Sequence, residues 1–312
     1  MSIVSTDRSV RALLKQGIDQ LRAANVPSYT LAAELLLVHV TSQNRTWLYS
    51  HPEEILPEAV AESYLGLLSR RISGVPTQHI TGKQEFWGLE FEVTPDVLIP
   101  RPETEHLIEV ALDRLAVREI RAGRPARLNG ENITLVDIGT GSGCIAITMA
   151  KELSAATIYA TDISGAALAV ARRNADRHGV ADRVHFLSCD LFDAFSNPVA
   201  PTPLSFDLIL SNPPYVALRE ADTLPVEVRE HEPRAALFGG EEGYELYGTL
   251  IPQAAQFLKP GGLLVLELGY NSLPAVEPLL DRTDWVNVAV TKDLSGISRV
   301  ISAERLPARD HR

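Results

Sequence analysis

The sequence predicts an α/β fold built on a mainly parallel, doubly wound sheet and preceded by a small helical bundle. From about Asn132 onward, short β-rich runs alternate with segments of helical periodicity, which is the order that parallel sheets require. The segment after the first of these strands is rich in glycine, whereas residues 1–83 show helical spacing without a strand pattern. We therefore expect a helical substrate-recognition domain at 1–83, a β-hairpin linker at 84–100 and the α/β domain at 101–312.

The composition limits the classes of protein to consider. The chain has 312 residues, of which 45% are hydrophobic and 22% are charged, and this suffices for one large domain and a smaller one. Its formal net charge of -11 and its pI of about 5.2 argue against general binding of nucleic acid, which needs clustered Lys and Arg. The Arg-rich stretch at 114–127 is interpreted as a solvated loop, so we expect no direct nucleic-acid partner.

Signals for targeting or for metal binding are not found in the pattern. The first 17 residues contain no signal-peptide core, and no stretch approaches the ~18 apolar residues that span a bilayer. Cys144 and Cys189 form neither a Cys-x-x-Cys pair nor a metal-like cluster with His, and both lie in apolar segments. We interpret them as buried free thiols and expect a soluble cytoplasmic protein with no metal and no membrane partner.

The residues before the linker are predicted to be helical from the spacing of their apolar side chains. Pro27, Pro52, Pro57 and Pro76 separate the helical segments. A small bundle results, and because it has no cofactor motif its default role is recognition or support. The apolar positions are Val10, Leu13, Leu14, Ile18 and Leu21, then Leu31, Leu35 and Val38, and finally Tyr64, Leu67, Leu68 and Ile72.

A hairpin and a proline-rich segment follow. Leu89, Phe91 and Val93 alternate with acidic residues after Gly88, which predicts a β-hairpin over 85–93. The next segment reads Leu98-Ile99-Pro100-Arg101-Pro102-Glu103-Thr104-Glu105. Its two prolines keep the chain extended before a helix that begins near Glu103.

The α/β domain is predicted from buried strands separated by helices. Strands are expected at 133–136, 158–161, 184–187, 208–210 and 263–268, with helices at 144–153 and 166–178. Two further runs at the end of the chain, 286–290 and 299–301, are expected to close the sheet as an antiparallel hairpin. The three prolines within 196–203 predict a surface loop.

Glycines recur in the loop after the first strand, Asp137-Ile138-Gly139-Thr140-Gly141-Ser142-Gly143. A chain that turns sharply while a ligand approaches its backbone needs glycine. A dinucleotide site more often has Gly-x-Gly-x-x-Gly. The present form, preceded by Asp, is similar to the loop of class I methyltransferases, which accommodates a methionyl and ribose group. A structural strand-to-helix turn is the alternative.

Two carboxylates at later strand ends favour a cofactor site. Asp162 ends the second strand, about 20 residues beyond Gly141, which is the usual spacing for a carboxylate that binds ribose hydroxyls. Asp190 is expected to end the third strand, where a carboxylate can accept a hydrogen bond from an adenine amino group. Either residue could instead be a helix cap. Together with the glycine loop, they predict S-adenosylmethionine as the cofactor.

The predicted catalytic motif is Asn212-Pro213-Pro214-Tyr215, at the carboxyl end of the fourth strand, where open α/β sheets bind ligands. An amide or aromatic amino nitrogen is a poor nucleophile because its lone pair is delocalised. The Asn212 side-chain oxygen and the Pro213 carbonyl can accept hydrogen bonds from such a nitrogen, and the two prolines preorganise them. Tyr215 offers a flat surface beside a planar group. A proline-stiffened loop is the alternative.

The motif with this glycine loop resembles both DNA amino-methyltransferases and protein glutamine N5-methyltransferases. The rest of the chain resembles the HemK/PrmC family over nearly its whole length, including the helical domain. The segments that carry this resemblance are Arg70-Arg71, Gly74-Val75-Pro76, Gly82, Glu85-Phe86, Gly88, Phe91, Val97 to Glu105, His231-Glu232-Pro233-Arg234-Ala235-Ala236-Leu237, Gly239-Gly240, Gly243, Lys259-Pro260-Gly261-Gly262, Glu267-Leu268-Gly269 and Asp293-Leu294-Ser295-Gly296.

The resemblance implies a class I methyltransferase that modifies the glutamine of the Gly-Gly-Gln motif in class I peptide chain release factors. It implies that Gly139 to Gly143, Asp162 and Asn212 bind the cofactor, and that the four motif residues bind the substrate glutamine. Leu191 stands where some relatives have an aromatic residue, so its contact with adenine would be aliphatic. A glutamine of a large-subunit ribosomal protein and adenine N6 in DNA are the alternative substrates. A catalytically inactive scaffold is disfavoured because no motif residue is missing.

Overall fold

The computed structural model describes residues 7–121, 133–196 and 204–306. The chain divides into two compact units. One comprises Met1–Lys83 together with Pro225–His231, and the other comprises Gln84–Leu224 together with Glu232–Arg312. We call them the helical unit and the α/β unit and describe each by itself.

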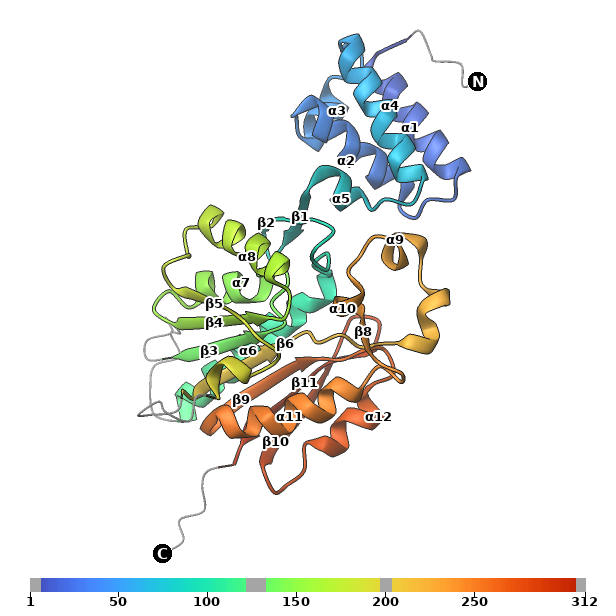
Figure 1. Cartoon of the computed structure of the whole chain (residues 1–312). Helices are drawn as coiled ribbons and strands as arrows, with labels where there is room; N and C mark the ends of the chain where they lie inside the picture. The colour runs from blue at the N-terminus through green and yellow to red at the C-terminus, as the bar shows by residue number, and fades with distance from the viewer. Residues whose placement is uncertain (1–6, 122–132, 197–203, 307–312) are drawn as a thin grey trace, which may run out of the picture. The chain divides into compact units, whose positions relative to one another are not determined.

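The helical unit confirms the three helices expected from apolar spacing, α1 (Val10–Ala23), α2 (Tyr29–Thr41) and α4 (Glu58–Ile72) (Figure 1). Short helices α3 (Arg45–Ser50) and α5 (Thr77–Thr81) complete it. The apolar faces of these helices form one core, in which the buried Tyr64 hydroxyl donates to the Ala33 carbonyl at 3.2 Å. Among the core residues are Val10, Leu13, Leu21, Leu36, Leu37 and Leu68.

A segment distant in sequence belongs to the helical unit, and no sequence pattern indicated it. Helix α9 (Val226–Arg229) lies within Pro225–His231. Its Glu227 forms an ion pair with Arg71 of α4, whose side chain is only 6% exposed. Arg71 also donates to the Val75 carbonyl at 3.3 Å. A buried guanidinium thus joins the inserted helix to the bundle.

The expected hairpin is present as β1 (Lys83–Phe86) and β2 (Leu89–Glu92), which pair as a two-stranded sheet. Trp87 and Gly88 between them have φ of 54° and 70°. Positive φ at both turn positions matches the right-handed twist of the paired strands. The turn is fastened to the next helix, because the Trp87 backbone N–H donates to the Glu105 carboxylate at 2.8 Å.

The main sheet of the α/β unit has seven strands in the order β10-β11-β9-β6-β3-β4-β5 (Figure 1). The five strands from β9 to β5 are parallel, and β11 and β10 add an antiparallel hairpin at one edge. The expected mainly parallel sheet with a closing hairpin is therefore confirmed. The strands are β3 (Thr134–Ile138), β4 (Thr157–Asp162), β5 (Val184–Ser188), β6 (Phe206–Ser211), β9 (Leu258–Glu267), β10 (Trp285–Lys292) and β11 (Ser298–Arg305).

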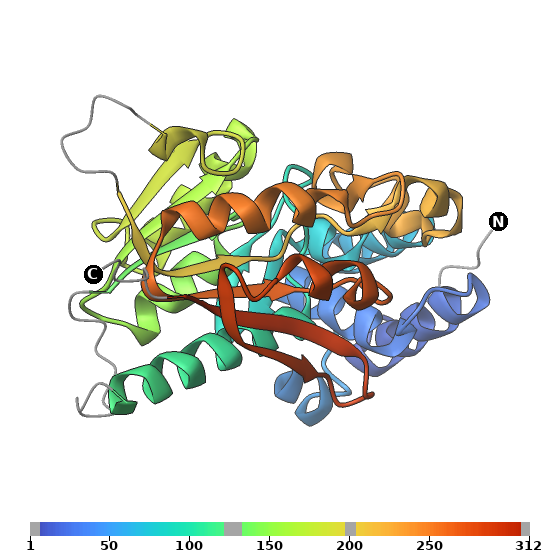
Figure 2. The ribbon, with the colours of Figure 1, turned by 90° about the horizontal axis from the view of Figure 1, so that it is seen from below.

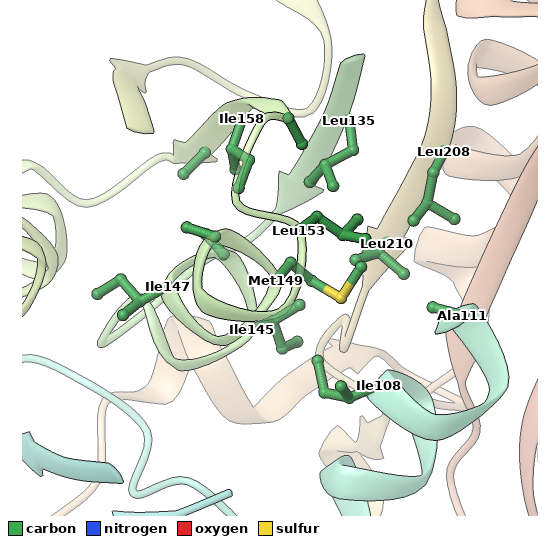
Figure 3. Packing of buried hydrophobic residues seen from close by; sticks show 14 of the residues in the cluster. Ile108, Ala111, Leu135, Ile145, Ile147, Met149, Leu153, Ile158, Leu208 and Leu210 are labelled. Carbon is green, nitrogen blue, oxygen red and sulfur yellow. The ribbon is translucent and has the colours of Figure 1, made fainter. Parts of the chain in front are cut away.

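Helices cover both faces of this sheet, which is why alternate residues of its strands enter two separate cores. Helices α6 (Glu105–Arg121), α7 (Cys144–Glu152) and α8 (Gly165–Arg177) pack on one face. Figure 3 shows Ile108 of α6 and Met149 of α7 packed towards Leu210 of β6 in that core. Helices α11 (Glu245–Phe257) and α12 (Leu273–Val276) pack on the other face. In Figure 2, α6 and α11 lie on opposite sides of the strands.

Short elements connect the longer strands and helices. The chain after β6 forms β7 (Val216–Ala217), which pairs in parallel with β8 (Phe238–Gly240). The remaining short helices are η1 (Pro102–Thr104), η2 (Asp193–Phe195), η3 (Leu218–Thr223), α10 (Arg234–Leu237) and η4 (Glu277–Leu279). Such short elements have no periodicity that a sequence pattern could reveal.

Two sequence expectations need correction. The Arg-rich stretch is not a loop, because its residues up to Arg121 continue α6 and form ion pairs: Arg114 and Arg121 with Glu304, and Arg118 with Asp207. Residues 122–127 lie outside the described residues, as do 197–203 of the expected surface loop. Cys144 is buried as expected, whereas Cys189 is only half-buried.

Candidate active site

A cavity of about 550 Å³ lies at the carboxyl ends of β3, β4 and β6, within the α/β unit. Its wall is largely apolar, with contributions from Ile138, Ile163 and Leu250. A concave apolar site with a few polar groups is typical of small-molecule binding. Eight residues expected from the sequence line it, namely Gly139, Gly141, Asp162, Asp190, Leu191, Asn212, Pro213 and Pro214.

The glycines of the loop serve two different purposes. Gly139, Gly141 and Gly143 all have positive φ, at 75°, 56° and 84°. A Cβ added at Gly139 or Gly141 would have nothing within 4 Å, so the backbone there faces open space. A Cβ on Gly143 would lie 2.8 Å from Ile147 Cδ1, so this glycine allows close helix packing instead.

Thr140 and Ser142 are buried beneath the loop and do not line the cavity. The Thr140 hydroxyl donates to the Asp137 carboxylate at 2.6 Å, and the Ser142 carbonyl accepts from Asn174 at 2.9 Å. Asp137 also accepts from the Ala146 backbone N–H at 3.2 Å. Complete burial raises the pKa of Asp137 to about 7, although these hydrogen bonds oppose the shift. The motif Asp therefore fixes the shape of the loop from below.

Asp162 lies at the rim of the cavity and ties three segments together. One carboxylate oxygen accepts from the Gly141 backbone N–H at 2.9 Å, and the other accepts from the Ser164 N–H at 2.8 Å. Burial raises its pKa despite these bonds. Each carboxylate oxygen has a further lone pair, so these bonds leave room for a ligand hydroxyl. Asp162 is not the helix cap that was the alternative, because the N-cap of α8 is Ser164, whose side chain accepts from the Ala167 N–H at 3.1 Å.

Asp190 and Leu191 lie two and three residues beyond the end of β5, which stops at Ser188. Leu191 has a φ of 41°, in the left-handed region, which is uncommon for a residue with a branched side chain. This turn lets both side chains line the cavity. The sequence contains no signal for such a backbone conformation.

Asn212 directly follows β6, and its side-chain amide is hydrogen-bonded to a residue of η1. Its Nδ2 donates to the hydroxyl of Thr104, in η1, at 3.1 Å. Its Oδ1 is buried and has no partner among the described residues. A buried amide oxygen without a donor is costly in a folded protein and marks a place where a ligand can donate.

Tyr215, the last residue of the motif, does not line the cavity. Its hydroxyl donates to Glu267 Oε1 at 3.3 Å, and burial raises its pKa. Glu267 ends β9 and is 1% exposed, and burial raises its pKa to about 7. Thr104 and Glu267 were not among the site residues expected from the sequence. Their signal is that polar residues occupy buried positions where a strand ends or a proline-rich segment begins a helix.

A parallel sheet with helices on both faces, a glycine loop and acidic residues at successive strand ends define a class I S-adenosylmethionine-dependent methyltransferase. The hMettl16 catalytic domain, solved in complex with MAT2A 3'UTR hairpin 1, shares this fold at a TM-score of 0.55 and 16% identity, covering 88% of this chain and 92% of that one. Residues 12–82 match the PrmC N-terminal domain family, and residues 129–289 match a methyltransferase domain family.

Full-length relatives place the chain more closely. It is 43% identical to the release factor glutamine methyltransferase of Koribacter versatilis, over 92% of this chain and 97% of the relative. It is 40% identical to the release factor glutamine methyltransferase of Nitratidesulfovibrio vulgaris, over 98% of both chains. The chain belongs to the release factor glutamine methyltransferase family, which confirms the family resemblance and the cofactor expected from the sequence.

Proposed function

We propose that this protein transfers a methyl group from S-adenosylmethionine to the N5 amide nitrogen of the glutamine in the Gly-Gly-Gln motif of class I peptide chain release factors. The observation that carries the proposal is the buried Asn212 amide oxygen, which has no donor among the described residues and belongs to a residue that lines the cavity. A substrate amide N–H supplies the missing donor. The full-length relatives named as release factor glutamine methyltransferases support the choice of substrate.

The residues of the cavity fit S-adenosylmethionine. Open space above Gly139 and Gly141 accommodates a ligand against the backbone, and the carboxylates of Asp162 and Asp190 offer acceptors for ribose hydroxyls and an adenine amino group. Leu191 offers an aliphatic contact for the adenine. Thr140, Ser142 and Gly143 shape the loop from behind. When bound, the cofactor supplies an electrophilic methyl group.

The motif residues are proposed to prepare the substrate amide. Amide nitrogens are weak nucleophiles because their lone pair is delocalised into the carbonyl. Asn212 Oδ1 and the Pro213 carbonyl can accept hydrogen bonds from the two N–H groups of the substrate amide. These bonds favour a tetrahedral nitrogen whose lone pair is free to attack the methyl group. Pro213 and Pro214 both line the cavity, and their fixed φ preorganises these acceptors. Tyr215 is proposed to shape the substrate side of the motif from its position beside Glu267.

The protein partner is proposed from the chain as a whole. Two glycines beside the target glutamine let its backbone enter a narrow cleft without side-chain clash. The helical unit, matched as a PrmC N-terminal domain at 12–82, is proposed to bind a part of the release factor other than its Gly-Gly-Gln loop. We keep 1–83, 84–100 and 101–312 as the proposed domains, with Pro225–His231 packing with the first.

None of the helices in the described ranges has the length and hydropathy to cross a membrane. Because release factors act on the ribosome, we propose a cytoplasmic location.

Labelled methyl transfer tests the proposal. The protein is incubated with labelled S-adenosylmethionine and, in separate reactions, a purified class I release factor, ribosomes and unmethylated duplex DNA. The label is then mapped by mass spectrometry. We expect it on the glutamine of Gly-Gly-Gln and expect none on a release factor in which that glutamine is replaced by asparagine. Label only on a large-subunit ribosomal protein, or on adenine, would overturn the substrate assignment.

A short peptide provides a second comparison. Contacts remote from the reacting group contribute to positioning, so an isolated Gly-Gly-Gln peptide should be a much poorer substrate than the intact factor. Equal kcat/KM for the two would show that the helical unit does not contribute to recognition.

A further inference from the structure

Buried polar side chains lie next to one another beside Asn212. Thr104, 2% exposed, accepts from Asn212 Nδ2 at 3.1 Å. The same hydroxyl lies close enough to the carboxylate of Glu267 to oppose the rise of its pKa. Glu267 is 1% exposed, and its Oε2 has no hydrogen-bond partner among the described residues. Tyr215 donates to the other carboxylate oxygen at 3.3 Å. Glu267 is therefore bonded to Tyr215 at one end of the motif and lies beside Thr104, the partner of Asn212 at the other end.

The Thr104 hydroxyl has a single proton, and its oxygen already accepts from Asn212. The neighbouring carboxylate of Glu267 has an unpartnered oxygen and, when ionised, can only accept, so it attracts this proton. The Thr104 oxygen then faces Asn212 as an acceptor, and only the NH₂ side of the Asn212 amide can pair with it. The amide oxygen is left at the other end of the group, where it is buried with no partner in the described part of the chain.

We propose that Thr104 and Glu267 are positioning residues, which orient the Asn212 amide so that its oxygen, and not its NH₂ group, meets the substrate amide. This inference rests on the function proposed above. In the opposite orientation the Asn212 oxygen would face the Thr104 oxygen without a proton between them. The NH₂ group would then face the substrate N–H groups, and the site would lack the acceptor that its chemistry needs.

The ionisation of Glu267 decides which way the Thr104 proton points. Burial raises the pKa of Glu267 to about 7, opposed by the hydroxyls of Thr104 and Tyr215 and by the charge of Arg299. A protonated Glu267 could donate to Thr104, whose own proton would then be free to face Asn212. The titratable and charged groups that act on or beside Glu267 are Glu103 on η1, Cys144 on α7, Tyr215 after β6, Tyr247 on α11 and Arg299 on β11.

Three threonine variants test the role of the hydroxyl. Thr104→Val removes it at nearly constant volume, Thr104→Ser restores it, and Thr148→Val is the matched control. Thr148 is a fully buried threonine in α7 whose hydroxyl has no partner among the described residues. For Thr104→Val we expect kcat to fall roughly tenfold to a hundredfold, the range that corresponds to one buried donor left unpaired. Its Kd for S-adenosylmethionine should stay close to that of the wild type. Thr104→Ser should recover most of the turnover, and Thr148→Val should keep it.

The pH profile separates positioning from simple packing. Wild-type kcat should increase with pH around the pKa of Glu267, about 7. This pH dependence should be lost in Glu267→Gln, whose side chain can accept from Thr104 at every pH. Asp137, whose pKa is also about 7, remains in both proteins. The inference would be overturned if kcat of Glu267→Gln rose with pH at the same midpoint as the wild type. It would also be overturned if Thr104→Val and Thr148→Val had equal kcat.

Failure of this inference can be told apart from failure of the proposed function. If the wild-type protein does not methylate a release factor, the proposed function fails. The variants are then compared on whichever glutamine substrate the wild type methylates. A measurement without substrate is the ¹⁵N NMR signal of the Asn212 side-chain amide, assigned by its loss in Asn212→Ala. Its hydrogen exchange should be slow in the wild type and Thr104→Ser and faster in Thr104→Val. Equal exchange in all three would contradict the inference.

Discussion

The carboxylate of Asp162, at the end of β4, accepts a hydrogen bond at 2.9 Å from the backbone N–H of Gly141. This bond joins two neighbouring strand ends at the rim of the cavity, so one side chain both shapes the glycine loop and faces the proposed ribose site. Asp162→Ala should therefore weaken S-adenosylmethionine binding by roughly 10- to 150-fold, which corresponds to about 1.5–3 kcal/mol for one charged acceptor. Calorimetric titration measures this. Asp176→Ala, an exposed carboxylate on α8, is the control. Unchanged affinity in Asp162→Ala would refute the ribose assignment.

The glycine loop predicts a contrast between two substitutions. Gly141→Ala places a Cβ in open space at a φ of 56°, so it should lower the free energy of unfolding by only roughly 1 kcal/mol while weakening cofactor binding strongly. Gly143→Ala places a Cβ 2.8 Å from Ile147 and 3.1 Å from Ala171, so it should destabilise the fold by about 2 kcal/mol or more. Denaturant unfolding and calorimetric titration of both variants test this. Equal losses of stability would contradict the assignment of separate roles.

Asn212→Ala should fold normally and lose methyl transfer by roughly 10²–10³-fold, by analogy with the loss of one preorganised polar group at a transition state. The variant deletes the unpaired oxygen of the site and leaves Thr104 and Glu267 in place. Single-turnover kinetics on the intact substrate, with circular dichroism as the check on folding, measure the effect. Near-normal turnover would show that the amide-acceptor mechanism is wrong.

Stability should depend on pH through Glu267. Its folded-state pKa of about 7 lies above the ordinary value, so its stabilising contribution is complete below the unfolded pKa and is lost as the pH rises through 7. The slope is at most about 1.4 kcal/mol per pH unit. Glu267→Gln should therefore lose less stability between pH 5 and pH 8 than the wild type does in urea unfolding. Identical differences in the two proteins would mean that Glu267 does not titrate in this range.

The inserted helix α9 should stabilise the helical unit through its buried ion pair. Glu227→Ala leaves the Arg71 guanidinium, 6% exposed, without its partner, and should cost about 3 kcal/mol. Glu53→Ala is the matched control, because it breaks the exposed pair with Arg11 in the same unit and should cost less than about 1 kcal/mol. Thermal unfolding compares them. Equal effects would mean that the Arg71 charge does not depend on Glu227.

The sequence predicted most of the fold because its signals are local. Apolar spacing located α1, α2 and α4, and the alternation of strands with helices located the parallel sheet, including the closing hairpin of β10 and β11. These patterns depend on neighbouring residues only. The Arg-rich stretch was misjudged because its charges are neutralised by Asp207 and Glu304, which are far away in sequence.

The sequence by itself determined the glycine loop, the carboxylates at the strand ends and the Asn212 motif. Each is a short run of residues whose chemistry can be recognised without knowing which distant residues surround it. Only the tertiary structure decided which buried polar residues contact the Asn212 motif. Thr104 and Glu267 are more than 150 residues apart and lie next to each other beside Asn212. Helix α9 likewise joins α4 across a long separation. Such pairings depend on how strands and helices pack in three dimensions, since a buried polar group finds its partner in space rather than along the chain.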